Sequence, residues 1–331
     1  MTVDPRALPL LSMADGVIDM GKTITELSLM KNDLQARVAT QEAEIARLKK
    51  LAETGFAPRF PGDVPTGKIR IGIRSDTNTA QAGLVRSFWR PDQVTSSVSY
   101  AKANHTAGQL PWLSYKLPGT WGQAAAGNND AWLKDIFTRL NDLGKPVWVA
   151  FHHEPEGDGV IDDWKAMQRR FAAAAKAYPN IAYSIILTGW NQFYGAYPMS
   201  MMWPGDDAGI NILGFDPYSW WGTVKNGVKN TENPEMFNLY WSKIYEFVKT
   251  RPNLAWAVAE TALTDEYFAT WPGAAWMRNS AATAAAYGAV AWTYWDYGFV
   301  GDDPSYSFRL SGAKLAAFNA VANAPHSVKG I

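Results

Sequence analysis

The feature that most limits the possible folds of this 331-residue chain is an alternation of short apolar runs with longer amphipathic stretches. Helices are predicted at 130–143, 162–178, 234–250, 274–287 and 312–322. Strands are predicted at 68–74, 94–100, 110–115, 147–152, 181–188, 210–215, 255–260 and 289–294. Eight strands interleaved with helices over about 250 residues predict an α/β fold, a (β/α)8 (TIM) barrel.

A doubly wound open sheet is the alternative fold with the same alternation. The first predicted strand is followed by Gly72-Ile-Arg-Ser-Asp76, which is not the glycine-rich G-x-G-x-x-G loop of dinucleotide-binding sheets. The sequence also has no G-x-x-x-x-G-K-[ST] phosphate loop. These differences favour the barrel, and we expect no cofactor.

The stretch 20–54 contains no proline and carries a heptad pattern. One core position holds Ile24, Lys31, Val38, Ile45 and Ala52, and the other holds Leu27, Leu34, Gln41 and Leu48. This pattern predicts a coiled coil that joins two or three copies of the chain. The alternative is a single amphipathic helix packed on its own domain. We expect an N-terminal segment at 1–19, the coiled-coil helix at 20–54, a linker rich in proline and glycine at 55–67, and the barrel domain at 68–331.

Composition excludes several classes of protein. The 31 basic and 31 acidic residues balance, whereas nucleic-acid-binding proteins usually carry a basic surplus. The absence of cysteine excludes disulfides, thiolate metal sites and a cysteine nucleophile. No apolar run is long enough to span a membrane, and the apolar patch at 7–11 is too short for a signal peptide. We therefore expect no membrane span, and a cytoplasmic protein or one exported by another route.

Two glutamates, Glu154 and Glu260, each close an apolar run at a predicted strand end, where a (β/α)8 barrel carries its active site. Paired carboxyl groups are typical of glycoside hydrolysis, in which one group donates a proton and the other stays ionised. The 16 tryptophans favour a groove that stacks sugar rings, with Trp190 and Trp295 after strand ends. Asp216 and Asp296 are alternative carboxyl groups at other strand ends.

The pair His153-Glu154, together with Glu260, resembles the clan of retaining (β/α)8 glycosidases. Within that clan it resembles family 26 glycoside hydrolases, which include β-mannanases. The phrase Phe151-His-His-Glu-Pro-Glu-Gly-Asp158 is similar to a divergent actinobacterial and phage branch of the family. Over residues 68–322, the resemblance implies that Glu154 is the acid/base, that Glu260 is the nucleophile, and that the Tyr218 hydroxyl lies against the nucleophile. Typical mannanases have an aromatic-rich stretch after the acid/base, whereas this chain has Pro-Glu-Gly-Asp-Gly at 155–159.

The orientation of the side chains around these glutamates follows from strand alternation. Strict alternation places His152 with Glu154, and a bulge at the strand end would instead turn His153 toward Glu154. We favour His153 as the neighbour, and we expect no metal because adjacent side chains diverge and no third ligand is evident. Trp256, Val258 and Glu260 share one face, which we expect to point into the barrel. We expect Glu156, Asp158, Asp162 and Asp163 to cap the next helix.

These observations predict a retaining, endo-acting glycosidase that cleaves a polysaccharide, either a cell-wall glycan or a mannan-type polymer. The expected substrate-binding residues are His153, Asp216, Tyr218, Trp190 and Trp295. A coiled coil before such a domain resembles actinobacteriophage minor tail proteins, which implies a place in a virion tail among other tail proteins. The alternative is a non-catalytic carbohydrate-binding or structural tail or adhesion protein that retains the barrel.

Overall fold

The computed structural model describes residues 57–75, 81–225, 227–231, 235–298 and 307–331, together with Ser28, Lys31 and Gln35. The chain divides into two compact units, 1–57 and 58–331, and the second contains the barrel. Apart from three single residues, the predicted N-terminal segment and coiled coil lie outside the described residues. The oligomer that they would form therefore stays a prediction.

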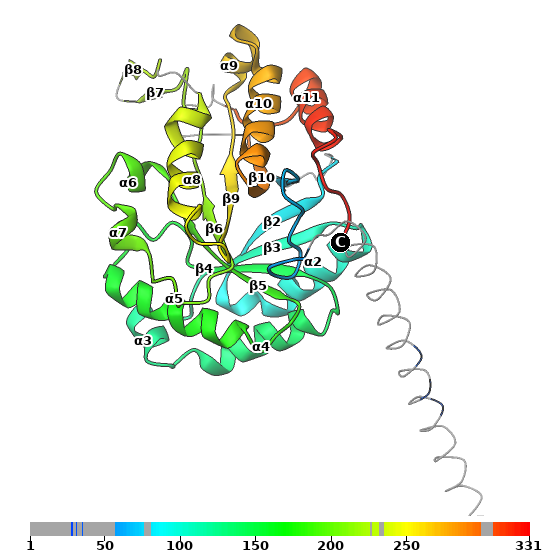
Figure 1. Cartoon of the computed structure of the whole chain (residues 1–331), viewed down its shortest axis with the longest axis vertical. Helices are drawn as coiled ribbons and strands as arrows, with labels where there is room; N and C mark the ends of the chain where they lie inside the picture. The colour runs from blue at the N-terminus through cyan, green and yellow to red at the C-terminus, as the bar shows by residue number, and fades with distance from the viewer. Residues whose placement is uncertain are drawn as a thin grey trace, which may run out of the picture. The chain divides into compact units, whose positions relative to one another are not determined.

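Eight parallel strands close into a barrel surrounded by helices (Figure 1). The strands are β1 (Arg70–Ser75), β2 (Leu84–Trp89), β3 (Leu110–Tyr115), β4 (Val147–Phe151), β5 (Ile181–Leu187), β6 (Ile212–Phe215), β9 (Ala255–Thr261) and β10 (Ala289–Asp296). Their order around the barrel is β1-β10-β9-β6-β5-β4-β3-β2. The antiparallel strands β7 (Val224–Lys225) and β8 (Val228–Lys229) form a separate hairpin. The predicted barrel architecture is confirmed.

From β2 onward, helices connect successive strands of the barrel and cover its outside. The helices are α2 (Val94–Thr106), α3 (Trp121–Ala125), α4 (Asp130–Asn141), α5 (Ile161–Ala175), α6 (Trp190–Phe193), α7 (Met199–Met202), α8 (Ser242–Val248), α9 (Asp265–Thr270), α10 (Gly273–Ala286) and α11 (Gly312–Ala322). In α4, the buried residues Leu133, Ile136, Phe137 and Leu140 recur at helical spacing, so that one face packs against the strands.

The predicted strand at 94–100 is wrong. These residues begin α2, and the second strand is β2, which the sequence analysis missed. The β-branched residues at 94–100 suggested a strand, but burial of Val94, Ser97 and Ala101 follows the three- and four-residue spacing of a helix. In β2, Arg86 interrupts the apolar run that would have marked a strand. The other seven predicted strands lie where the sequence places them.

The inside of the barrel is filled by residues of alternating size. Trp112 and Trp148 are fully buried there, at a distance of 5.3 Å between ring centroids. On β9 it is the alanines Ala255, Ala257 and Ala259 that face this interior. Trp256 and Val258 instead pack in the layer between strands and helices, so the predicted inward orientation of these two residues is wrong.

Part of the predicted linker belongs to the barrel unit, which begins at Pro58. Phe60 is only 5% exposed, and its ring packs edge-on against Trp148 at 6.0 Å. The indole Nε1 of Trp148 donates to the carbonyl of Pro61 at 3.0 Å, and Arg70 Nε donates to the carbonyl of Gly62 at 3.0 Å. This segment therefore packs against the end of the barrel at which the strands begin.

Among the helices of the described residues, none combines the length and the apolar character that crossing a membrane requires.

Candidate active site

A cleft of about 510 Å³ lies at the carboxyl ends of the strands. Its lining residues are Phe88, Ser114, Lys116, His153, Glu154, Tyr218, Trp220, Glu260, Trp295 and Phe308. They come from β2, β3, β9 and β10 and from the segments that follow β3, β4, β6 and β10. The cleft therefore occupies the position at which barrel enzymes bind their substrates.

Glu260 enters this cleft because β9 is irregular near its end. Val258 pairs with Trp292 and Thr261 pairs with Tyr294, so three steps along β9 match two steps along β10. Such a bulge changes the direction of the side chains that follow it. Although strict alternation would group it with Trp256 and Val258, Glu260 therefore turns toward the barrel interior, where it contacts Arg86.

The carboxylate of Glu260 is held by two donors. Its Oε1 accepts from Arg86 Nε at 3.1 Å and lies 3.0 Å from Arg86 Nη2, and its Oε2 accepts from the Tyr218 hydroxyl at 2.5 Å. Burial raises the pKa of Glu260, and the Arg86 guanidinium and the Tyr218 hydroxyl oppose this rise because they stabilise the charged form. The contacts also fix the orientation of the carboxylate in the cleft.

A second carboxyl group, Asp216, is buried beside the same arginine and is not among the residues that line the cleft. Its Oδ2 is 3.7 Å from Arg86 Nη2, and neither of its side-chain oxygens accepts a hydrogen bond from the described residues. Burial, and next the charge of Glu260, raise the pKa of Asp216 well above its usual range. Because Arg86 makes its shorter contacts with Glu260, we infer that Glu260 carries the negative charge and Asp216 the proton.

The backbone at the end of β4 has two residues in the left-handed region, His152 at φ 49° and Glu154 at φ 50°. Each such residue other than glycine costs about 1–3 kcal/mol and persists only when its surroundings hold it. The result is that His153 and Glu154 both line the cleft. His152 points elsewhere, with its Nε2 3.0 Å from Asp158 Oδ2 and its ring edge-on to Trp121 at 4.8 Å.

Glu154 has an environment that differs from that of Glu260. Burial raises its pKa to about 7, with further contributions from the negative charges of Glu260, Glu156 and Asp158. Arg86 opposes this rise. Within the described part of the chain, no residue donates a hydrogen bond to the Glu154 carboxyl group. A carboxyl group that is partly protonated near neutral pH can donate its proton to a bound ligand.

His153 is a neutral imidazole in the wall of the cleft. Burial lowers its pKa well below the usual value, and the charges of Arg86 and Lys116 lower it further. Its ring lies 5.0 Å from the ring of Phe88. A neutral imidazole has one donor and one acceptor nitrogen, which suits it to bind a hydroxyl group of a ligand.

Aromatic side chains form much of the remaining wall. Trp220 is 44% exposed and lies 5.4 Å from Tyr218, whose ring stacks on Phe308 at 5.5 Å and an interplanar angle of 11°. Trp295 completes the lining on β10. Trp190, by contrast, lies on α6, is 56% exposed and is not among the residues that line the cleft.

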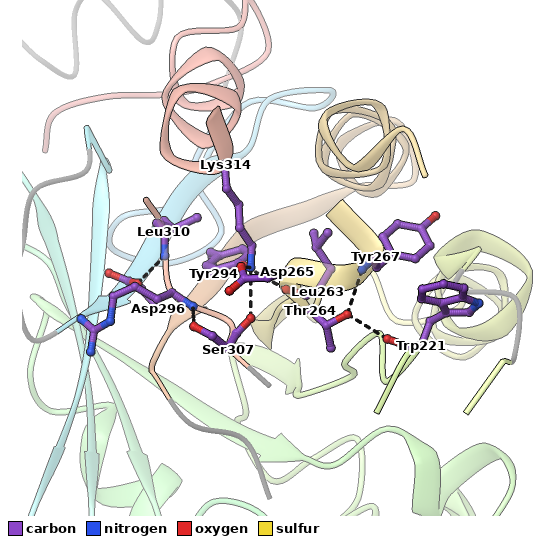
Figure 2. Close-up of polar contacts among 11 residues, drawn as sticks. Trp221, Leu263, Thr264, Asp265, Tyr267, Tyr294, Asp296, Ser307, Leu310 and Lys314 are labelled. Atoms are coloured by element: carbon purple, nitrogen blue, oxygen red, sulfur yellow. Dashed lines mark hydrogen bonds and ion pairs between the residues drawn. The ribbon is translucent and has the colours of Figure 1, made fainter. Parts of the chain in front are cut away.

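The segment that carries Phe308 is fixed by polar contacts beyond the end of β10 (Figure 2). The Leu310 amide donates to Asp296 Oδ1 at 2.7 Å, and Lys314 Nζ donates to Asp265 Oδ1 at 2.8 Å and to the Ser307 carbonyl at 3.3 Å. Burial lowers the pKa of Lys314, and the charge of Asp265 opposes this. Asp296, an alternative catalytic carboxyl group in the sequence analysis, therefore anchors this segment and does not line the cleft.

Sequence reasoning missed several residues of this site, above all Arg86 and Phe308. Arg86 had a usable signal, because a lone arginine inside the run Leu84–Trp89 indicates a strand with one charged, inward-facing residue. Phe308 had no such signal, because it precedes α11 in a segment without periodicity.

Glu156 was expected to cap α5, but its carboxylate instead contacts Thr188 and Gln192. In the ranges that the structure describes, no cluster of three or more histidine, aspartate or glutamate side chains is placed to hold a metal ion.

Comparison with known proteins supports the fold. No family model and no curated protein matches the chain. Among solved structures, it is similar to a fungal β-1,4-galactanase (TM-score 0.54, 12% identity, 74% of this chain and 88% of the other). It is also similar to a β-glycosidase, BGL167 (TM-score 0.54, 11% identity, 73% and 82%). A third similar structure is Thermotoga maritima Cel5A in complex with mannotriose (TM-score 0.54, 9% identity, 76% and 98%). The chain therefore has the (β/α)8 barrel fold that these glycosidases share.

Proposed function

We propose that this protein is a retaining glycoside hydrolase in which Glu154 is the acid/base and Glu260 is the nucleophile. One observation carries the proposal: two carboxyl groups line one cleft, and Glu260 alone of the two is held by an arginine and a tyrosine hydroxyl. Glu260 is paired with Arg86 and accepts from Tyr218, whereas burial and neighbouring negative charges raise the pKa of Glu154 to about 7. A carboxylate stabilised by a cation suits the nucleophile, and a carboxyl group that keeps its proton near neutral pH suits the acid.

The reaction would proceed by double displacement. In the first step, Glu260 attacks the anomeric carbon while Glu154 gives its proton to the glycosidic oxygen of the leaving sugar. This step forms an ester between the sugar and Glu260. In the second step, Glu154, now ionised, takes a proton from water, which attacks the anomeric carbon and releases Glu260. Arg86 and Tyr218 would orient the Glu260 carboxylate throughout.

We propose a polysaccharide as the substrate, cleaved within the chain. The exposed face of Trp220 and the side chain of Trp295 offer surfaces on which sugar rings can stack. The names of the similar structures mention β-1,4-galactanases and a mannotriose substrate. The resemblance of His153-Glu154 to family 26 also favours a mannan-type or cell-wall glycan. These polymers are the first to screen.

We further propose that the barrel is displayed in two or three copies by the heptad-patterned helix at 20–54. Multiple copies would increase the affinity for a repetitive polymer without new contacts. A virion tail with other tail proteins as partners fits this arrangement if the chain is phage-encoded. Otherwise, the chain would act in the cytoplasm or after export by another route. Sedimentation analysis of the full chain tests the copy number.

Glu154→Gln and Glu260→Gln test the proposed function. The wild-type chain should release products from at least one of mannan, galactan and arabinogalactan. In each variant, kcat on that polymer should fall by about 10²–10⁴-fold or more. NMR of the first product should show retention of the anomeric configuration. Wild-type activity should fall as pH rises through about 7, because Glu154 loses its proton there. Near-wild-type turnover in either variant would refute the roles. Binding without product release would instead support the non-catalytic binding protein.

A further inference from the structure

Glu156 is a partly buried carboxylate that the proposed reaction does not use. Its Oε1 accepts from the Thr188 amide at 3.0 Å, from the Thr188 hydroxyl at 3.2 Å and from Gln192 Nε2 at 2.5 Å. Its Oε2 is buried and accepts from no described residue. Thr188 follows β5 and Gln192 lies on α6. Glu156 therefore connects the loop after β4 to the loop after β5.

This connection lies beside the strained end of β4. The Glu154 amide donates to the Ile186 carbonyl of β5 at 2.9 Å. Two residues further along each segment, Glu156 contacts Thr188. On the preceding side, the His152 carbonyl accepts from Trp164 Nε1 at 3.2 Å. The left-handed residues His152 and Glu154 are thus held by contacts before and after them, as a strained backbone requires.

We propose that Glu156 is a positioning residue, which fixes the β4–α5 loop to Thr188 and Gln192 and thereby holds Glu154 in the cleft. The inference rests on the proposed function, in which Glu154 must meet the glycosidic oxygen. Glu156 itself does not line the cleft, so it acts through Glu154. A shift of Glu154 by a fraction of an ångström would impair proton transfer without preventing a sugar from stacking on Trp220 or Trp295.

Glu156 also acts on Glu154 through its negative charge. Burial raises the pKa of Glu156, and the hydrogen bonds from Thr188 and Gln192 oppose this by stabilising its charged form. Its charge in turn contributes to the raised pKa of Glu154. The other charged groups that act on Glu154 are Glu260 on β9, Arg86 on β2 and Asp158 on the same loop as Glu156.

Two substitutions separate these effects. Glu156→Ala removes both the contacts and the charge, and it should lower kcat by on the order of 10- to 100-fold with a smaller change in KM. Glu156→Gln keeps an oxygen that accepts from Thr188 and Gln192, so it should retain more of kcat than the alanine variant. Because it removes a negative charge near Glu154, the alkaline limb of its kcat/KM profile should move to lower pH.

Asp158→Asn is the matched control. Asp158 lies on the same loop and carries the same charge, but its side chain is 54% exposed, and it contributes least to the raised pKa of Glu154. The alkaline limb of the kcat/KM profile should move to lower pH by less in Asp158→Asn than in Glu156→Gln. An equal or larger movement would contradict a specific role for Glu156.

A measurement that needs no substrate keeps this inference separate from the proposed function. NMR of ¹³C-labelled glutamate carboxyl groups, assigned with Glu154→Gln, should show Glu154 titrating at lower pH in Glu156→Gln than in the wild type. If no glycan is cleaved, the proposed function fails while this titration still tests the coupling. If Glu156→Ala does not fold, Glu156→Gln carries the test. An unchanged Glu154 titration, or wild-type kcat in a folded alanine variant, would overturn the inference.

Discussion

Arg86→Met removes the cation that two buried carboxyl groups share. The Arg86 side chain is fully buried, with Nη2 at 3.0 Å from Glu260 and 3.7 Å from Asp216, and Nη1 donates to the Ser114 hydroxyl at 2.8 Å. Methionine is apolar and also unbranched, so it can occupy much of the same space without a charge. We therefore expect the variant to keep the barrel and to leave both carboxyl groups without their partner.

The expected cost follows from burial. Removing one partner of a buried ion pair destabilises a protein by about 3–5 kcal/mol, because the remaining charge loses its compensation. For a domain of this size, each kcal/mol lowers Tm by roughly 2–4 °C. We therefore expect Tm to fall by roughly 6–20 °C at a pH at which Glu260 is ionised.

The loss should depend on pH in a defined direction. The folded-state pKa values of Glu260 and Asp216 are raised, so their contribution to stability is fully present below their unfolded pKa values, at about pH 4. This contribution is lost as pH rises through the folded pKa values. Without Arg86 those values rise further. The difference in Tm between wild type and variant should therefore be small near pH 4 and grow toward pH 8.

Thermal unfolding followed by circular dichroism across this pH range measures the effect. Arg170→Met is the control, because Arg170 pairs with Asp130 at the surface, where the side chains are 40% and 50% exposed. Such a pair contributes about 0–1 kcal/mol. A decrease in Tm that is equal at all pH values in Arg86→Met, or that is no larger than the decrease in Arg170→Met, would refute the reasoning.

Two further predictions concern the cleft and the base of the barrel. Trp295→Ala should lower kcat/KM by roughly tenfold or more, because Trp295 lines the cleft. Trp190→Ala should have little effect on kcat/KM. A larger loss of kcat/KM in Trp190→Ala than in Trp295→Ala would place the sugar outside the cleft. Phe60→Ala should destabilise the full chain by about 3–5 kcal/mol in thermal unfolding, and Phe60→Leu by less, because the Phe60 ring packs on Trp148. Unchanged unfolding of Phe60→Ala would show that residues 58–64 do not stabilise the barrel.

The barrel could be predicted from the sequence because burial leaves a local record. A buried strand is a short apolar run and a covering helix has apolar residues every three to four positions, so seven of the eight strands were located. Glu154 and Glu260 were found for the same reason, since each is the charged residue that ends an apolar run. The second strand was missed because Arg86 breaks its run.

Only the tertiary structure decided which groups meet in the cleft and which way they point. Arg86 and Glu260 are 174 residues apart in sequence and come together only because the barrel closes in one register. The bulge on β9 and the left-handed residues at the end of β4 turn Glu260 and His153 toward the cleft, against strict alternation. A local pattern records that a residue is buried. Its neighbours, and with them its pKa and its role, depend on contacts between segments that are distant along the chain.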